Sequence, residues 1–488
     1  MGLDLLFLGI DIGTTGTKSI LFDEKGAIVS RAYQGYGLTT PAPGWVEQDP
    51  QDWWDAVKFT VKECLKENRS HQDVRALAIS AQGGSIVLMD RDSKPLGSAI
   101  SWLDTRAKGG RQAFLDAKGA EYYHERTGFT LKTGLAMQEI KWLQTHDPDR
   151  FAKTAVIYST LDYLNFRLTG RAALDPSCAA LMQLLNVKEK TWDPEILELI
   201  SLDQGKLAPL KPAGSLVGRL TAAAAAELGL PESAEVYNGG LDQACMALGC
   251  GAVNSGDIVL STGTAWAMLA VTDRPNIIKG LKFSVIPHVV KNKWCLMSTI
   301  PSAGAGLDWL REKLLGFDEA ESYKVMDAKI AEREPGAKGI MVFPFFSEGA
   351  GLTSQITGLT LAHDRYDLLR AYLESICFEI KRMLDALERE GLQLDCLRVT
   401  GGASRSKIWM SILSNILHKT IRAEANPDAA CTGAGELAAM GSGCLPAGFD
   451  HPAGSGKDAQ TIFEPDPDES AIYQGLYEKY SRNRPNEK

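Results

Sequence analysis

The sequence predicts an α/β fold built from two related halves, on the basis of three observations. Short apolar runs alternate with a helical pattern across the first hundred residues, as in mixed α/β domains. The turn Gly13-Thr14-Thr15-Gly16 separates two apolar runs near the N-terminus, and Thr262-Gly263-Thr264 does the same about 250 residues later. The echo indicates one such hairpin in each half, although a chance likeness of two glycine turns is the alternative.

Composition narrows the class of protein. A chain of 488 residues is too long for one hydrophobic core, and its 44% hydrophobic and 23% charged residues are ordinary for globular domains. The formal charge of −9 argues against a nucleic-acid partner. The nine cysteines form no CxxC pair and are expected as buried free thiols, which favours a cytoplasmic protein. No apolar run reaches the roughly 18 residues of a membrane span, so no membrane partner is expected.

The elements of the first half follow from local patterns. A third strand is expected at residues 27–33, and a helix starts at Asp49-Pro50 with Asp49 as its cap. Apolar residues at helical spacing give this helix one buried face. Further strands are expected at 74–80, 86–90, 154–158 and 235–242, with helices at 161–168 and around 222–226.

The second half repeats the strand–turn–strand pattern of the N-terminus. Residues 256–271 are predicted to form a strand, a glycine–threonine turn and a second strand. A long helix at 366–390 and a strand at 397–400 lead to the turn Gly401-Gly402-Ala403-Ser404-Arg405-Ser406, which opens a helix ending at Leu417. One more helical pattern lies around residues 473–480.

Three glycine-rich turns, at residues 13–17, 262–265 and 401–406, each follow a predicted strand. Glycine lets backbone N–H groups converge on phosphate oxygens, and threonine hydroxyls add donors. The ligand that would use all three turns is a nucleoside triphosphate bound between two domains. Asp11 lies beside the first turn, where a carboxylate is compatible with phosphate if Mg²⁺ lies between them. Ordinary hairpins remain the alternative, and no Walker A sequence occurs.

Asp242 is the candidate catalytic base. It follows the apolar strand that ends in Asn238-Gly239-Gly240-Leu241. A carboxylate at this position can accept the proton of a hydroxyl that attacks a γ-phosphoryl group. The alternative is a helix-capping aspartate ahead of Gln243, and the two roles are compatible.

An ordered set of motifs resembles the FGGY family of carbohydrate kinases. The resemblance covers roughly residues 5–445, with motifs that are specific as a set and weak singly. It implies the actin-like, ribonuclease-H-like duplicated fold with an interdomain cleft. It also implies an N-terminal domain at 1–245 for sugar binding and a C-terminal domain at 246–488 for nucleotide binding. The matching segments are residues 9–18, 43–50, 240–244, 261–264, 358–375 and 401–406.

The resemblance implies ATP and Mg²⁺ as cofactors, a small sugar as the partner, and dimers as a common state of such kinases. By the same resemblance Asp242 is the general base and Asp11 holds Mg²⁺, through water. The residues matched to the nucleotide and its phosphates are Thr14, Thr15, Lys18, Thr264, Gly304, Gly402, Ala403 and Ser406. The residues matched to the sugar are Gln82, Gly83, Trp102, Asp104, Asp242 and Gln243.

The sugar loop departs from the pattern of xylulokinases. These carry Gln-Met-His-Gly where this chain has Gln82-Gly83-Gly84-Ser85, so a roomier pocket with fewer donors is expected. They also carry Trp-Asn-Asp where Trp102-Leu103-Asp104 stands, and residues 345–351 lack the usual Gly-Glu-Arg-Thr-Pro run. The first choice of substrate is a ketopentose such as D- or L-xylulose, phosphorylated at a primary hydroxyl. Another sugar, polyol or aldonate is an alternative, as is a non-kinase ATPase switch of the same superfold.

Overall fold

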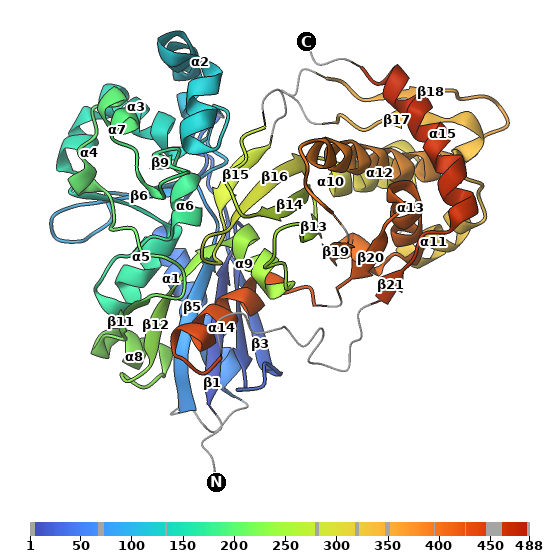
Figure 1. The fold of residues 1–488 in the computed structure, drawn as a ribbon. Coiled ribbons are helices and arrows are strands. Elements are labelled where there is room, and N and C mark those ends of the chain that lie inside the picture. The colour runs from blue at the N-terminus through green and yellow to red at the C-terminus, as the bar shows by residue number, and fades with distance from the viewer. Residues whose placement is uncertain are drawn as a thin grey trace. The chain divides into compact units, whose positions relative to one another are not determined.

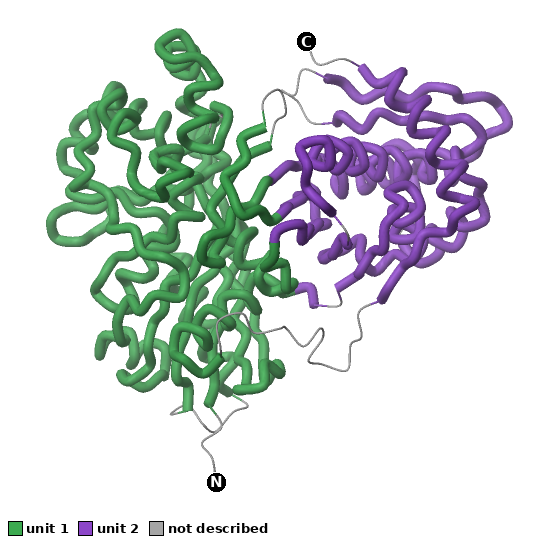
Figure 2. The backbone as a smooth tube through the Cα atoms, in the orientation of Figure 1, with its two compact units in different colours: residues 1–254, 271–296, 428–456 green, residues 255–270, 297–427, 457–488 purple. Residues whose placement is uncertain are grey.

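The computed structural model describes residues 5–66, 73–131, 134–278, 283–317, 322–346, 352–394, 396–424, 426–445 and 461–485. The chain forms two compact units, coloured green and purple in Figure 2. Unit 1 comprises residues 1–254, 271–296 and 428–456, and unit 2 comprises residues 255–270, 297–427 and 457–488. Each unit therefore gathers segments that lie far apart in the sequence.

A six-stranded sheet in the order β11-β12-β5-β1-β2-β3 forms the centre of unit 1. Strands β1, β5 and β12 run parallel, whereas β1–β2, β2–β3 and β11–β12 pair antiparallel. Their carboxyl ends thus lie at one edge of the sheet, the edge where α/β folds bind ligands. The strands are β1 (Leu6–Ile12), β2 (Gly16–Phe22), β3 (Ile28–Gly35), β5 (Val74–Ala81), β11 (Leu216–Arg219) and β12 (Glu235–Leu241).

Helices pack against this sheet (Figure 1). The predicted face of α1 (Pro50–Lys66) is buried, and Asp49 accepts the Gln51 N–H at 2.8 Å ahead of Pro50. Helix α14 (Ala429–Gly441) packs on β1 so closely that a Cβ at Gly9 would lie 2.0 Å from the Cys431 carbonyl oxygen. The other helices in contact with the sheet are α5 (Thr160–Thr169) and α9 (Asp242–Gly249), whereas α8 (Ala222–Leu228) packs on α1 and α5.

The remainder of unit 1 consists of smaller elements. A four-stranded sheet has the order β4-β7-β6-β8, and β9 pairs antiparallel with β10. The strands are β4 (Glu47–Gln48), β6 (Ile86–Met89), β7 (Ala99–Ile100), β8 (Val156–Ser159), β9 (Leu185–Asn186) and β10 (Thr191–Trp192). The helices are η2 (Arg106–Gly110), α2 (Arg111–Thr127), α3 (Ala136–His146), α4 (Pro148–Lys153), α6 (Pro176–Ala180), α7 (Pro194–Leu199) and η3 (Gln204–Lys206).

A second sheet repeats the strand arrangement of the first. It has seven strands in the order β15-β16-β14-β13-β19-β20-β21. The antiparallel hairpin β13–β14 matches β1–β2, and the parallel neighbours β19 and β20 match β5 and β12. The predicted duplication is thus present in the strand order. The strands are β13 (Ile258–Thr262), β14 (Trp266–Thr272), β15 (Ser284–Pro287), β16 (Trp294–Ile300), β19 (Cys396–Gly401), β20 (Thr420–Ala423) and β21 (Thr461–Phe463).

Helix α12 (Arg365–Arg389), with both α13 (Lys407–Leu417) and α15 (Pro467–Asn483), provides most of the helical packing in unit 2. The predicted helix at 366–390 matches α12 within one residue, and α15 extends the pattern expected at 473–480. The remaining elements are α10 (Ala303–Trp309), η4 (Leu310–Leu314), α11 (Tyr323–Ala331), η5 (Ala337–Gly339), β17 (Met341–Phe343), β18 (Gln355–Thr357) and η6 (Gly402–Arg405).

Cysteine burial follows the sequence expectation with two exceptions. The thiols are free, and seven cysteines are buried, whereas Cys396 is half-buried and Cys444 is exposed. Across the part of the chain that the structure describes, no helix is both long and apolar enough to cross a membrane.

Candidate active site

The first glycine turn joins β1 to β2 and is held from several sides. Gly13 N–H donates to the Gly16 carbonyl at 2.9 Å, and the Tyr36 hydroxyl donates to the Gly13 carbonyl at 2.6 Å. Gln48 Nε2 donates to the Thr14 carbonyl at 2.7 Å. The carbonyls of the turn are thus engaged by the protein, while Thr15 is exposed to solvent. This leaves a rigid turn with its outer face open to a ligand.

Asp11 lies one residue before the end of β1 and is in register with Ser80 of the neighbouring strand β5. Ser80 is in turn in register with Gly240 of β12. The Ser80 hydroxyl donates to Asp11 Oδ1 at 2.7 Å. Burial raises the pKa of Asp11, while the Ser80 hydrogen bond and the nearby Lys18 lower it. Lys18 itself forms an ion pair with Asp428, Nζ to Oδ1 at 2.9 Å. Its ammonium is therefore fixed beside the turn.

Asp242 opens α9 directly after β12, as the sequence predicts. The Gln243 N–H donates to Asp242 Oδ1 at 2.7 Å, a contact with the next residue in the first turn of α9, whose N-cap is Leu241. Burial raises the pKa of Asp242 from its ordinary 3.8 to about 7, and the negative charge of Asp11 contributes to this rise. The opposing effect of the Gln243 hydrogen bond is smaller. A carboxylate with this pKa exists in both protonation states near neutrality and can exchange a proton with a hydroxyl.

The predicted sugar loop follows β5. Gln82 is buried and its Nε2 donates to Gln48 Oε1 at 2.9 Å. Gln82 Oε1 has no hydrogen-bond partner among the described residues. Because a buried amide oxygen is costly to leave unpaired, it is a ready acceptor for a ligand hydroxyl.

The expectation of a roomier pocket at Gly83 is not met at this position. A Cβ at Gly83 would lie 2.7 Å from Leu181 Cγ and 2.7 Å from Leu241 Cδ1. Gly84 has a φ of +88°, and a Cβ there would lie 3.0 Å from Trp102 Cβ. Leucine and tryptophan side chains therefore fill the space beside both glycines. This could not be read from the sugar loop itself, because Leu181 comes from another part of the chain.

Two further residues predicted to contact sugar differ in exposure. Trp102 is 41% exposed and its Nε1 donates to Thr14 Oγ1 at 3.0 Å, which ties it to the first glycine turn. Asp104 is fully buried. Its oxygens accept the Val46 N–H at 2.6 Å and the Arg106 guanidinium at 2.8 and 3.0 Å. The structure thus places Trp102 beside the turn and commits Asp104 to an internal ion pair.

Unit 2 holds the second and third glycine turns side by side, because Thr262 of β13 is in register with Gly401 of β19. The Thr262 hydroxyl donates to the Thr400 carbonyl at 2.7 Å and accepts the Ala403 N–H at 3.1 Å. Gly401 has a φ of +99°, and a Cβ there would lie 2.5 Å from the Thr262 carbonyl oxygen. One buried threonine therefore fixes both turns.

The other nucleotide-side residues join the same cluster, apart from Ser406. The N–H groups of Gly304 and Ala305 both donate to the Thr264 carbonyl at 3.0 Å. A Cβ at Gly304 would lie 2.2 Å from the Gly263 carbonyl oxygen, so only glycine allows this approach. Gly402 is exposed, whereas Ser406 accepts the Trp409 N–H at 3.2 Å and caps α13. The predicted departure at 345–351 lies partly outside the described residues, which end at Phe346 and resume at Leu352.

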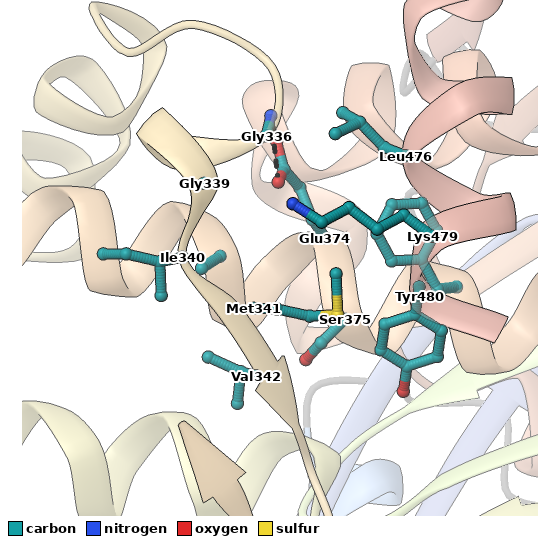
Figure 3. A pocket seen from close by; sticks show the side chains of 12 residues that line it. Gly336, Gly339, Ile340, Met341, Val342, Glu374, Ser375, Leu476, Lys479 and Tyr480 are labelled. Atoms are coloured by element: carbon teal, nitrogen blue, oxygen red, sulfur yellow. Dashed lines mark hydrogen bonds between the residues drawn. The ribbon is translucent and has the colours of Figure 1, made fainter. Parts of the chain in front are cut away.

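A pocket that the sequence did not predict lies beneath β17 in unit 2 (Figure 3). Glu374 of α12 forms part of its wall and is already satisfied by the Gly336 N–H, Arg370 and Tyr473. The sequence also did not single out Ser80, Ser177 or Asp428. Ser80 could have been found only with the register of β5 against β1, and Asp428 only with the packing of α14.

Two models of protein-family domains match most of the chain. A model of the FGGY family of carbohydrate kinases, N-terminal domain, matches residues 6–249, and the model of its C-terminal domain matches residues 258–442. The chain belongs to the FGGY family of carbohydrate kinases. This FGGY kinase accordingly has the two-domain, actin-like α/β fold that the family resemblance implies, with the two related halves that the glycine hairpins predict.

The relatives of this FGGY kinase carry different substrate names. It is 29% identical over 444 residues to a xylulose kinase of Bacillus subtilis, covering 89% of this chain and 88% of the relative. It is 29% identical over 448 residues to a gluconokinase of Bacillus licheniformis, covering 88% and 86%. The crystal structure of a xylulose kinase from Rhodospirillum rubrum superposes with a TM-score of 0.90 at 27% identity, covering 98% of both chains.

Proposed function

We propose that this carbohydrate kinase transfers the γ-phosphoryl group of ATP to a primary hydroxyl of a small sugar, with a ketopentose such as xylulose as first choice. The observation that carries the proposal is Asp242. It opens a helix at the carboxyl end of β12, two residues after Gly240, which shares a row of the sheet with Asp11, and its pKa of about 7 suits a general base.

Asp242 acts as the base in this proposal. Gln243 N–H engages Oδ1, which leaves Oδ2 for the sugar hydroxyl. As the hydroxyl oxygen forms its bond to the γ-phosphorus, its proton passes to Asp242. The bond from the γ-phosphorus to the bridging oxygen breaks, and its electron pair leaves with ADP. Leu241 is the N-cap of α9 and Asp242 accepts the N–H of the next residue, so helix capping does not explain a carboxylate whose charge is disfavoured by burial and by Asp11.

We assign Mg²⁺ to Asp11. The donor chemistry fits, because Mg²⁺ prefers oxygen ligands and is commonly held by one or two carboxylates together with substrate phosphates. The mutual repulsion of Asp11 and Asp242 also leaves negative charge that a divalent cation would neutralise. Bound Mg²⁺ would supply charge neutralisation of the phosphoryl oxygens. Within the described residues, no group of three or more histidine, cysteine or acidic side chains could hold a metal.

The phosphate and nucleotide contacts are assigned to the glycine turns. In unit 1, Thr14 and Thr15 would donate to phosphate oxygens and Lys18 would add positive charge. Asp428 holds Lys18 in place for that role. In unit 2, the cluster fixed by Thr262 would receive the nucleotide through Thr264, Gly304, Gly402 and Ala403, and Ser406, which caps α13, would add a further contact. The division into a sugar-binding region at 1–245 and a nucleotide-binding region at 246–488 is part of this proposal.

Sugar recognition is assigned to the loop after β5 and to its neighbours. The unpaired Oε1 of Gln82 would accept a sugar hydroxyl, and the indole of Trp102 would cover the substrate beside Gly83. Gln243 also carries an unpaired Oε1 among the described residues. Asp104 would act indirectly, through Arg106 and the backbone of Val46. The name shared by the Bacillus subtilis and Rhodospirillum rubrum relatives supports xylulose, and the gluconokinase relative supports an aldonate as the alternative.

The test is an ADP-release assay with Mg·ATP against pentuloses, hexuloses, polyols and aldonates. We expect turnover that depends on one compound of the panel, with the phosphate recovered on that compound. Turnover only with gluconate would overturn the ketopentose assignment and keep the kinase mechanism. Equal ATP hydrolysis with and without every sugar would overturn the proposal and favour a nucleotide-driven switch.

A further inference from the structure

The backbone that carries Asp242 is held on one side by a side chain rather than by a strand. Strand β12 pairs with β5 along one edge as far as Leu241. On its other edge β11 pairs with β12 only as far as Tyr237. The peptide groups just before Asp242 therefore lack a neighbouring strand on that edge.

Ser177 occupies the place of the missing strand. Its hydroxyl oxygen accepts the Leu241 N–H at 2.9 Å, and Ser177 is fully buried. The approach is close, since a Cβ at Gly240 would lie 3.1 Å from Ser177 Oγ and 2.3 Å from Val289 Cγ1. Glycine at 240 thus allows the hydroxyl to reach the residue that directly precedes the base.

Asp175 fixes the Ser177 hydroxyl in turn. Its Oδ1 accepts both the hydroxyl and the N–H of Ser177, the latter at 2.8 Å, and its Oδ2 accepts the Ala213 N–H at 2.8 Å. Asp175 is 2% exposed. Because the Ser177 hydroxyl donates its proton to a carboxylate, its lone pair is directed to the Leu241 N–H. The buried pair thus has one fixed orientation.

We propose that Ser177, oriented by Asp175, is a positioning residue for phosphoryl transfer that fixes Asp242 against the reacting hydroxyl. The proposal rests on the proposed role of Asp242 as the base. Ser177 touches neither reacting group in this account. It acts by holding the Leu241 peptide, so its loss shifts the carboxylate and lowers the rate of transfer, not the affinity for sugar or nucleotide.

The test is a double-mutant cycle of Ser177→Ala and Asp242→Asn in the full chain, with kcat and the KM for sugar measured at saturating Mg·ATP and the KM for Mg·ATP measured at saturating sugar. We expect Ser177→Ala to lower kcat about tenfold or more and to leave both KM values within about twofold. In the Asp242→Asn background the same change should have no further effect on kcat, because residues that act as a unit are not additive. Ser414→Ala is the control: it removes another fully buried hydroxyl, which donates to the Lys419 carbonyl at 2.9 Å in unit 2, and kcat should not change.

The outcomes separate the two proposals. Full turnover by folded Asp242→Asn overturns the proposed function. Loss of turnover in Asp242→Asn together with a normal kcat in Ser177→Ala, or with losses that multiply in the double variant, overturns the positioning role alone. If Ser177→Ala does not accumulate as folded protein, Ser177→Cys replaces it, because a thiol is a weaker donor and acceptor at the same place. A smaller loss confined to kcat then supports the positioning role, and a wild-type kcat overturns it.

Discussion

Replacing Asp242 by asparagine is expected to lower kcat to a small residual value and to make the folded protein more stable. The pKa of Asp242 is about 7 in the folded chain instead of 3.8. Above pH 7, where the carboxylate is charged, this difference lowers the free energy of unfolding by about 4 kcal/mol. Because the side chain is only half-buried, water and counterions reduce this to about 1–2 kcal/mol. Asparagine has nearly the same shape and carries no charge.

The sign of the pH dependence follows from the raised pKa. Below about pH 4 the carboxyl group is protonated in both the folded and the unfolded chain, so it contributes no penalty. As the pH rises from 4 to 7 the unfolded chain ionises first, and folding loses stability. Above pH 7 the penalty is constant. The stability advantage of Asp242→Asn should therefore be absent near pH 4, grow up to pH 7 and then stay level.

The assay is the midpoint of thermal unfolding, followed by circular dichroism in EDTA at pH 4.5, 6 and 8, with the wild type beside the variant. Sugar-dependent ADP release at pH 8 is measured on the same preparations. An advantage of equal size at all three pH values, or no advantage at pH 8, would refute the idea that a desolvated charge at Asp242 destabilises the fold. Retained turnover would separately refute its role as base.

Three further outcomes are expected. Asp11→Asn should lower kcat/KM for Mg·ATP at least tenfold, and raising the Mg²⁺ concentration should recover part of this loss. If kcat/KM depends on Mg²⁺ equally in the variant and the wild type, Asp11 is not a metal ligand. Gly83→Ala should lower kcat/KM for the sugar, because its Cβ would lie 2.7 Å from Leu181 Cγ. Adding Leu181→Ala should restore part of that kcat/KM, and a double variant with a lower value than both single variants would contradict this contact. Gly304→Ala should raise the KM for ATP more than the KM for sugar, because its Cβ would lie 2.2 Å from the Gly263 carbonyl oxygen. Isothermal titration with ADP would measure the loss of nucleotide affinity, and an unchanged ADP affinity would contradict a place for Gly304 in the nucleotide site.

The fold was predictable where one local signal decides the structure. The turn at 13–16 and the helix that starts at Pro50 both follow from glycine, proline and capping preferences, and both are present. Strand β12 ends and Asp242 begins a helix where the apolar run stops. The duplication was also predictable, because each half carries its own glycine–threonine turn.

The rest depends on contacts between distant segments, which no local pattern encodes. The closed space at Gly83 comes from Leu181, and the fixed position of Lys18 comes from Asp428. Ser177 was missed for the same reason: one buried serine looks like any other until the partner of its hydroxyl is known. Asp104 shows the limit of motif matching, because the motif gave its position but not its internal ion pair with Arg106.

Helix α14 has a consequence for how the chain folds during synthesis. It belongs to unit 1, packs on β1 and α9, and approaches them through glycines that no side chain could replace: a Cβ at Gly433 would lie 1.9 Å from the Cys245 carbonyl oxygen. The ribosome releases this helix only after almost all of unit 2 has been made. One surface of β1 and α9 in unit 1 therefore stays uncovered until about 150 residues of unit 2, at 255–270 and 297–427, have been made, and such long-range closure is slow. Deleting residues 428–441 should therefore make unit 1 a target of chaperones and proteases, although the deletion changes no residue before 428.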